Sequence, residues 1–283
     1  MRWLIILILA NLALVYLYLP DAAQQQNKPE LCSVRLQDQV SEVNGTLAVE
    51  FINVGQGDST IIKSGDETML VDCGPKGASE SVLKTLAENN ISRLQKLLMT
   101  HSDADHIGAC KGILTKTRVD KIIINGVKGD TKTYTELEKE LKYRNIKVAE
   151  LCAIDSIGES QYQILNTGRG KKKHNDNSIV MLLKHGLTQF LFMADCDGDC
   201  EKQLPATDID VLKVGHHCGA RSSSTEFLEK TTPTIAVIHV GKNGYGFPSG
   251  ECLDRLNKAD AEIHRTDKNG NIIVTSNGIS IET

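Results

Sequence analysis

The sequence predicts an α/β protein built as a layered sandwich. Short runs rich in Val, Ile, Leu and Thr recur along the chain, have the length of β-strands and are bounded by Gly, Asp and Asn. Segments with apolar residues at helical spacing lie between them. Both halves of the chain show this mixture of strand-like and helix-like segments without repeating the sequence. We therefore expect layers of sheet and helix rather than an all-β or an all-helical domain.

The expected elements follow one another along the chain. In the first half, the pattern predicts strands at residues 47–54, 59–63, 68–72 and 96–100 and helices that begin at Ser79 and Tyr134. In the second half, it predicts strands at residues 178–183, 189–194, 209–214 and 234–240, a terminal strand pair within 271–282, and helices at 223–230 and 249–258. The terminal pair contains Ser-Asn-Gly, which is typical of a hairpin turn.

The N-terminus predicts a targeting segment followed by a linker. Arg2 precedes an uncharged apolar run over residues 3–19, which is just long enough to cross a bilayer. We therefore expect a signal anchor or signal peptide at 1–20, a polar tether at 21–45 and the folded domain at 46–283. An uncleaved anchor is favoured because no clear cleavage site follows the run. In either case the domain is expected outside the cytoplasm, membrane-anchored or secreted.

Composition narrows the function classes. The 283 residues carry a net charge of −4, which excludes a generally basic nucleic-acid binder. Only 4% of the residues are aromatic, so a platform for base stacking is not evident. The 8 cysteines are scattered along the chain. The close pair Cys196 and Cys200 is either a local disulfide or two free thiols, because the second pair that a zinc ribbon requires is missing.

The strongest chemical signal is the segment LLMTHSDADHIGAC. It places His101, Asp103, Asp105 and His106 on a short stretch directly after a predicted strand. Imidazoles and carboxylates that lie so close together on a loop can turn inward around a cation. Polar turn residues are the simpler explanation, but burying this many charges without a metal would be costly. The segment therefore predicts a metal site.

Further ligand candidates also follow predicted strands. Asp195 comes after the strand at 189–194, and His216 and His217 come after the strand at 209–214. A carboxylate can bridge two cations, while imidazoles complete the coordination and leave a position for water. One of the two adjacent histidines is expected to point away from the metal, toward a supporting or substrate contact.

The order of these motifs resembles a known family. The matching segments are FINVGQGDSTII, VDCG, THSDADHIGAC, NDNSIVMLL, FLFMADCD, DVLKVGHHCG and VGKNGYGFPS. From about residue 47 to residue 281, the chain resembles the metallo-β-lactamase superfamily, and within it the metallo-β-lactamase-like domain of the DNA-uptake channel protein ComEC and its stand-alone relatives. The resemblance implies a four-layer αβ/βα sandwich with metals between the two sheets, at the strand ends.

The resemblance also implies roles for individual residues. His101 and Asp103 would hold one metal and Asp105 and His106 the other, with Asp195 between them and His216 and His217 as later ligands. Asp105 and Asp195 would orient the attacking water and are therefore the catalytic candidates. Asp72 and Gly74 match the strand-end turn VDCG. Residues expected to support the ligands or contact substrate are Asp58, Asn177, Lys172 and Tyr245.

The chain departs from the family pattern at three places. Phe247 stands where family members often have a histidine in a YGHP segment. The third histidine of many superfamily members falls near Asn175 to Asn177, so His174 is the nearby imidazole. Cys218 replaces a usual glycine, and its thiol would be inert, oxidised or a soft ligand.

These observations predict metal-dependent hydrolysis. We expect one or two divalent ions, and both zinc and manganese stay open because three ligand positions carry carboxylates. The implied substrate is a phosphodiester such as extracellular DNA, with the basic cluster at 169–174 as either a phosphate contact or a solvated loop. A separate DNA-uptake channel would be a partner, since the chain has one apolar segment. The alternatives are hydrolysis of a small ester, lactone or lactam, and a non-catalytic metal-binding surface module.

Overall fold

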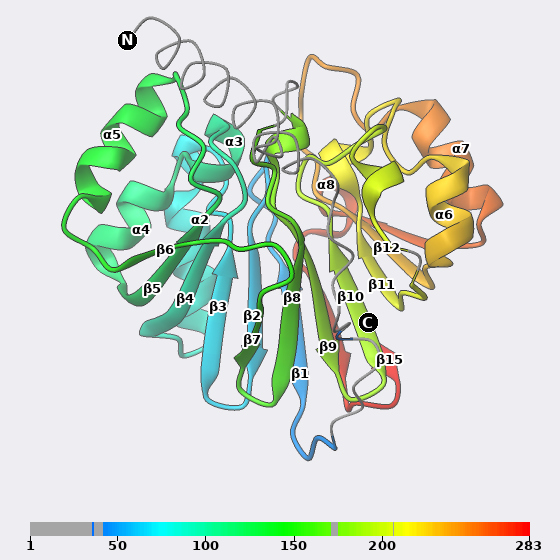
Figure 1. Ribbon diagram of the computed structural model, residues 1–283, viewed down its shortest axis with the longest axis horizontal. Helices are drawn as coiled ribbons and strands as arrows, with labels where there is room; N and C mark the ends of the chain where they lie inside the picture. Colours follow the sequence, from blue (N-terminus) through cyan, green and yellow to red (C-terminus); the bar gives the residue numbers. More distant parts are fainter. Residues whose placement is uncertain (1–35, 37–41, 171–174, 206) are drawn as a thin grey trace, which may run out of the picture. The chain divides into compact units, whose positions relative to one another are not determined.

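Two β-sheets face each other, and helices cover their outer faces (Figure 1). This computed structural model describes residues 36, 42–170, 175–205 and 207–283. The layers are those of the αβ/βα sandwich that the sequence predicts. The targeting segment predicted at 1–20 and most of the tether predicted at 21–45 lie outside the described residues. In the part that is described, no helix is long and apolar enough to cross a membrane.

Each sheet is made mainly from one half of the chain. The first sheet has the strand order β15 (Ile281–Glu282), β14 (Ile272–Ser276), β1 (Leu47–Phe51), β2 (Thr60–Ser64), β3 (Glu67–Val71), β4 (Arg93–Met99), β5 (Arg118–Ile124) and β6 (Ile146–Val148). The second has the order β13 (Glu262–Arg265), β12 (Ile235–Ile238), β11 (Val211–Lys213), β10 (Thr188–Phe192), β9 (Val180–His185), β8 (Ser160–Asn166) and β7 (Ile154–Ile157). The C-terminal hairpin β14–β15 therefore returns to the first sheet, where β14 pairs with β1.

The helices divide between the two outer layers. Those of the first half are α2 (Ser79–Glu88), α3 (Ala104–Ile107), α4 (Cys110–Lys116) and α5 (Lys132–Leu141). Those of the second half are α6 (Thr225–Thr231), α7 (Gly250–Lys258) and α8 (Thr266–Asn269). Short 3-10 turns complete the structure at η2 (Lys76–Ala78), η3 (Asn175–Asn177), η4 (Glu201–Gln203) and η5 (Gly215–Cys218).

The hydrophobic core lies in three layers. One lies between the sheets and includes Phe51 and Phe190. The second lies between the first sheet and helices α2, α4 and α5, and the third between the second sheet and helices α6 and α7. Strands in the middle of such a stack are covered on both faces, and β9 is buried at every position. This double burial explains why the sequence shows continuous apolar runs instead of strict alternation.

All the strands and helices expected from the sequence are present, with their ends shifted by a few residues. The sequence pattern did not reveal strands β5 to β8 or β13. In β5 the charged residues Arg118, Asp120 and Lys121 hide the apolar pattern. Asp120 pairs with Arg93 of the neighbouring strand β4, so these charges are used in pairing across the sheet. Helix α5 begins two residues before the expected start, because the Thr131 side chain caps it.

Parallel strands bring the polar loops of both halves to one edge. Strands β3 and β4 are parallel in the first sheet, and β10, β11 and β12 are parallel in the second. Parallel strands end at the same edge, and side chains that follow them can meet in the crevice beyond. The predicted ligands all lie in the segments that directly follow β4, β10 and β11, some of them in α3 and η5.

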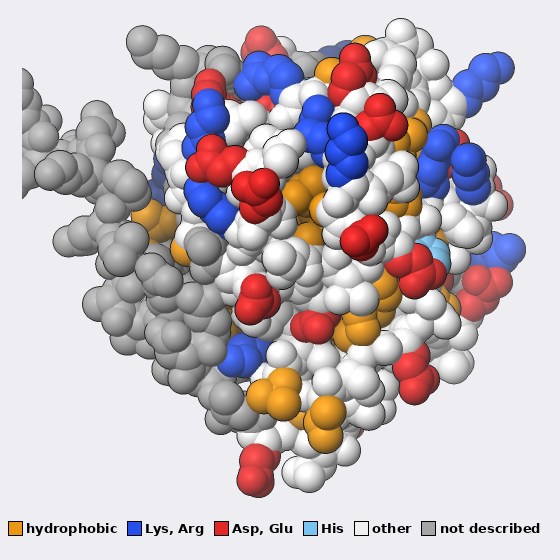
Figure 2. Space-filling model, turned by 90° about the vertical axis from the view of Figure 1, so that its right-hand side faces the viewer, with side chains coloured by type: hydrophobic (Ala, Val, Ile, Leu, Met, Phe, Trp, Pro, Cys, Tyr) orange, Lys and Arg blue, Asp and Glu red, His pale blue; other side chains and the backbone are white. Residues whose placement is uncertain are grey.

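The surface carries charges of both signs. Figure 2 shows the side of the molecule that bears α6 and α7, where Lys and Arg side chains are interspersed with Asp and Glu. This mixture agrees with the small net charge of −4. Among the described residues on this face, there is no broad basic surface of the kind that would hold a polyanion by itself.

Candidate metal centre

Asp72 organises the first two imidazoles. It follows β3 and accepts hydrogen bonds from the Thr100 backbone N–H at 2.8 Å, from Thr100 Oγ1 at 2.7 Å and from His106 Nδ1 at 2.7 Å. Because the Thr100 hydroxyl donates to Asp72, its oxygen is left to accept from His101 Nδ1, at 3.0 Å. Both histidines therefore carry a proton on Nδ1, and their Nε2 atoms are available as ligands.

His217 is oriented in the same way from the other sheet. Its Nδ1 donates to the backbone carbonyl oxygen of His239 at 2.9 Å, and its Nε2 lies 3.1 Å from Asp105 Oδ2. The turn η5 that carries it has positive φ angles at His216, His217 and Cys218. Such angles are unfavourable for residues with a Cβ and persist where the surrounding structure holds them, often at functional sites. Here the left-handed turn directs His217 into the interior, where its side chain is 1% exposed.

The Nε2 atoms converge on Asp195. His106 Nε2 lies 3.1 Å from Asp195 Oδ1, His101 Nε2 lies 3.7 Å from Asp195 Oδ2, and His217 Nε2 lies 3.8 Å from Asp195 Oδ1. His106 Nε2 and Asp195 Oδ1 are buried and make no hydrogen bond with any described residue. Buried polar atoms are rarely left in that state unless an ion or water completes them. The donors are also those that zinc and manganese bind, so these residues fit a divalent ion.

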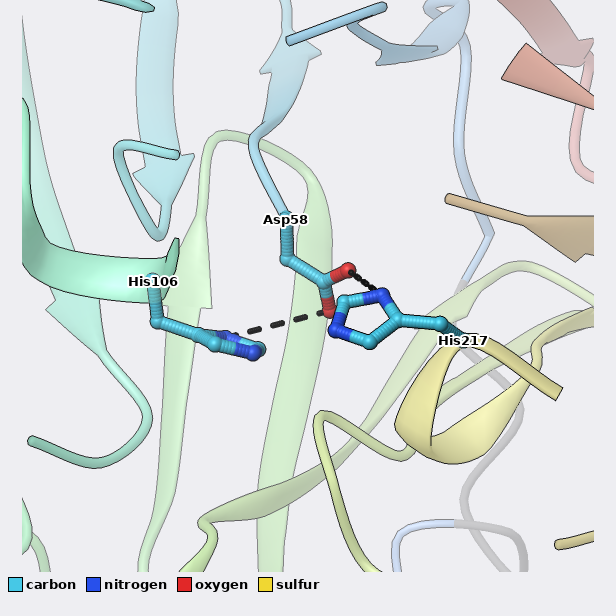
Figure 3. Close-up of side chains that lie close together, drawn as sticks. All are labelled: Asp58, His106 and His217. Atoms are coloured by element: carbon cyan, nitrogen blue, oxygen red, sulfur yellow. Dashed lines mark ion pairs between the residues drawn. The ribbon is translucent and has the colours of Figure 1, made fainter. Parts of the chain in front are cut away.

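A second group of potential ligands lies behind the imidazole rings. Asp58, His106 and His217 also offer ligand atoms within 4.8 Å of one another, and Figure 3 shows Asp58 between the two rings. Asp58, however, faces their Nδ1 atoms, at 3.9 and 3.5 Å, and forms an ion pair with Lys213. Since the Nδ1 atoms carry protons and the carboxylate already has a cation, we assign the metal to the Nε2 side and a supporting role to Asp58.

Neighbouring charges and burial shift the pKa values of these buried groups in different directions. Burial alone would raise the pKa of Asp58, but Lys213 and the surrounding histidines lower it below its ordinary value. Burial alone would lower the pKa of His106, but Asp195, Asp58 and Asp72 raise it well above its usual value. Burial lowers the pKa of His239 to about 4, so that ring is neutral at pH 7. A metal must therefore compete with protons for His106 Nε2, and its binding will release them.

The site opens into a cleft of about 540 Å³. Asp103, Asp105, Asp195 and Tyr245, which the sequence proposed as ligands or substrate contacts, line it, and Asp103 Oδ2 lies 3.5 Å from His101 Nε2. Asp58 does not line this cleft and is only 4% exposed, so it lies beneath the site instead of facing substrate.

Other predicted residues are not brought into the ligand group. His216 lies at the cleft wall, where Asn175 Nδ2 approaches its Nε2 to 2.9 Å and Asp197 Oδ2 its Nδ1 to 3.0 Å. Asn175 faces the cleft, while the predicted Asn177 contributes a backbone carbonyl that accepts from Asn125.

The basic cluster at 169–174 is only partly described. Lys172 and His174 lie outside the described residues. Arg169 donates to the backbone carbonyls of Asn125 and Ala149. Its guanidinium therefore holds two loops together rather than facing the cleft.

Three disulfides lie beside the ligand loops. They join Cys73 to Cys110, Cys196 to Cys200 and Cys218 to Cys252. The Cys196–Cys200 pair is thus a local disulfide, one of the two predicted forms, and Cys218 is oxidised and is not a soft ligand. Cys73 follows Asp72, Cys196 follows Asp195 and Cys218 follows His217 in the chain. Each of these three loops is therefore tied down one residue after a residue of the site.

Two residues of the site were not found from the sequence. Lys213 is 3% exposed in β11 and appeared only as part of an apolar strand. Thr100 appeared only as the end of a strand. The signal for Lys213 was available, because a lysine inside a run of apolar residues must meet a buried acid.

Comparisons with known proteins agree with this geometry. A family profile described as the Metallo-beta-lactamase superfamily matches residues 52–242. The chain is 28% identical over 253 residues to ComE operon protein 3 of Bacillus subtilis, covering 79% of this chain and 32% of that protein. It is 26% identical over 240 residues to Recombination protein 2 of Haemophilus influenzae, covering 81% of this chain and 29% of that protein. The chain thus spans about a third of the length of these curated relatives.

A solved structure with the same fold is the metallo-beta-lactamase fold protein YhfI from Bacillus subtilis. It superposes with a TM-score of 0.59 at 15% sequence identity, covering 82% of this chain and 100% of that chain. At this identity the likeness concerns the fold alone.

Proposed function

Because the chain belongs to the metallo-beta-lactamase superfamily and is a metal-dependent hydrolase of that superfamily, we propose that its cleft hydrolyses phosphodiesters, with extracellular DNA as the substrate. The observation that carries the proposal is the convergence of three imidazole Nε2 atoms and the Asp195 carboxylate at the floor of an open cleft. A divalent ion bound there would lower the pKa of a water molecule and stabilise negative charge on the group under attack.

The chain's own residues would divide the work. His101, Asp103 and Asp195 lie together on one side of the floor, and Asp105 and His217 lie together on the other. We assign the first set to one ion and the second to another, with His106 and Asp195 between them. Among these ligand candidates, Asp105 is the most open to the cleft, since its side chain is 33% exposed. It is therefore placed to accept a proton from an attacking water.

The cleft has features suited to a phosphodiester. Its acidic floor would repel an anion, but ions bound there reverse the local charge. Lys76 and Lys242 lie at the cleft wall, where ammonium groups can contact the flanking phosphates. The names ComE operon protein 3 and Recombination protein 2, together with the resemblance to a DNA-uptake protein, support DNA as the phosphodiester.

The disulfides support a place outside the cytoplasm. None of the cysteines in the described ranges is free, and disulfides persist in oxidising compartments. We therefore propose that the domain lies outside the cytoplasm, at the cell envelope, and acts together with a DNA-uptake channel.

The test uses the purified full chain. Metal is removed with a chelator and restored as Zn²⁺ or Mn²⁺, and cleavage of bis(p-nitrophenyl) phosphate, single-stranded DNA and duplex DNA is measured. Asp105→Ala is compared with Asp66→Ala, which changes an exposed residue in the turn between β2 and β3. We expect metal-dependent cleavage by the parent and by Asp66→Ala but not by Asp105→Ala. Turnover of a lactone or a lactam without any phosphodiester cleavage would reject the proposal in favour of small-ester hydrolysis.

A further inference from the structure

Two aromatic rings form one wall of the cleft. The ring of Tyr245 stacks on that of Phe247, with centroids 5.7 Å apart and an angle of 27° between the planes. Phe247 in turn meets the edge of His216, at 5.1 Å. Tyr245 is 77% exposed, so one face of its ring is covered by Phe247 while the rest of the side chain is open to the cleft. The rings of His216, Phe247 and Tyr245 thus contact one another in succession along the cleft.

The loop that carries these aromatics is held by one side chain. Asn243 Nδ2 donates to the carbonyl oxygens of Gly241 and Phe247, at 2.8 and 2.9 Å. Its Oδ1 accepts from the N–H groups of Tyr245 and Phe247, at 3.0 and 3.1 Å. Gly241 packs so closely on Gly55 that a Cβ there would lie 2.3 Å from the Gly55 carbonyl carbon. The exposed tyrosine therefore stands on a braced loop, which lowers the entropy lost when a ligand stacks on it.

Positive charge lies beside the aromatic wall. Lys242 directly precedes Asn243 in this loop, and Lys76 of η2 lies on the cleft as well. Within the described ranges, no ion pair is seen for either lysine. A cleft that is lined by an exposed ring and two lysines and that opens onto the candidate metal centre fits a ligand that is flat and aromatic at one end and anionic at the other. A nucleotide has this composition.

We propose that Tyr245 is the stacking platform for a nucleobase of the substrate, placed so that the adjoining phosphate reaches the metal centre. This inference rests on the proposed phosphodiesterase function and narrows its substrate class to nucleotides whose bases are unpaired. A base inside a duplex is already stacked on both faces, so the platform selects single strands or frayed ends. The low aromatic content of the whole chain gave no sign of this platform, because the platform needs only the few rings that line one cleft.

The direct test measures binding without turnover. Calorimetry compares thymidine 5′-monophosphate with 2-deoxyribose 5-phosphate on the metal-loaded full chain, its Tyr245→Ala and Tyr245→Phe variants, and a control, Tyr143→Ala. Tyr143 is 89% exposed and does not line the cleft. We expect the parent to bind the nucleotide about tenfold more tightly than the sugar phosphate. Tyr245→Ala should lose this preference, whereas Tyr245→Phe and Tyr143→Ala should keep it.

A parent that binds both compounds equally, or neither, would overturn the platform, as would a Tyr245→Ala variant that keeps the preference. A kinetic arm compares the p-nitrophenyl ester of thymidine 5′-phosphate with methyl p-nitrophenyl phosphate. The ratio of their kcat/KM values should fall about tenfold in Tyr245→Ala. If the parent shows the base preference in binding but cleaves neither ester, the phosphodiesterase proposal fails and the nucleotide site stands.

Discussion

Among the described residues, a partly buried and a fully buried cluster of charged groups lie between the sheets, and their hydrogen bonds are satisfied to different degrees. One, the Asp155 cluster, joins the sheets through Asp155 of β7, Lys96 of β4, Lys121 of β5 and Tyr162 of β8. There Asp155 Oδ1 lies 3.2 Å from Lys96 and accepts from the Ser156 N–H at 2.9 Å. Oδ2 accepts from Tyr162 at 3.0 Å and lies 3.4 Å from Lys121. Both carboxylate oxygens thus find donors within the chain.

The metal centre is completed more fully on the Nδ1 side of its imidazoles than on the Nε2 side, although Asp58 Oδ1 on the Nδ1 side also lacks a hydrogen-bond partner among the described residues. On the Nδ1 side, Asp72, Asp58 and Lys213 supply acceptors and a compensating charge. On the Nε2 side, His106 Nε2 and Asp195 Oδ1 have no hydrogen-bond partner among the described residues. A structural ion cluster thus satisfies the hydrogen bonds of its own atoms, whereas a functional one leaves several of its atoms aimed at a common point.

The largest expected effect concerns the charge beneath the site. Lys213→Met leaves the buried Asp58 carboxylate without its cation, so the free energy of unfolding should fall by about 3–5 kcal/mol. Urea unfolding of the metal-free protein measures this. The double variant Asp58→Asn with Lys213→Met removes both charges and should recover part of the loss. Equal stability of the parent and the single variant would show that Lys213 does not compensate Asp58.

A smaller effect, on metal affinity, is expected from a change on the Nε2 side. Asp195→Ala removes the carboxylate on which three imidazoles converge, and the affinity for Zn²⁺ or Mn²⁺ should fall by at least about 100-fold, because losing a ligand costs more than losing its support. Calorimetric metal titration of the full chain measures the change, with Asp66→Ala as the control. Retention of metal affinity in Asp195→Ala would place the ion elsewhere.

A change at Asp72 tests the orientation of the His106 ring without removing a metal ligand. In Asp72→Asn, an amide that can donate replaces an acceptor of His106 Nδ1–H, so the proton of the ring would shift toward Nε2. Metal affinity should fall about 10- to 100-fold, as is usual for a lost support. The same titration checks this result, and an unchanged affinity would show that Asp72 does not set the tautomer.

The smallest effect belongs to the Asp155 cluster. Burial alone would raise the pKa of Asp155, but the Ser156 N–H and Lys96 lower it from 3.8 to about 2. A lowered folded pKa contributes stability above pH 3.8 that is lost as the pH falls toward 2. Because solvent screens this partly exposed side chain, its contribution to the free energy of unfolding is about 1 kcal/mol.

Asp155→Asn should therefore lower stability at pH 7 and flatten its decline between those pH values, without changing metal affinity. Urea unfolding from pH 7 to pH 2 and metal titration check both statements. A change in metal affinity would contradict the separation of the two clusters.

The sequence predicted the fold well because apolar runs and helical spacing survive burial on both faces of a sheet. It also predicted His101, His106, Asp195 and His217, since ligand-type residues after strands are visible as a pattern. It could not tell which of His216 and His217 turns inward, because that depends on the left-handed turn of η5. Tyr245 was predicted from the resemblance, but its stacking on Phe247 depends on the bracing of the loop by Asn243.

The function proposed for the cleft requires the metal to lie on the Nε2 side of the imidazoles. Crystals of the protein grown with Zn²⁺ or Mn²⁺ and measured at the metal's absorption edge would locate the ion by anomalous scattering. We expect density in contact with His106 Nε2 and the Asp195 carboxylate. Density held by Asp58 on the Nδ1 side would contradict it.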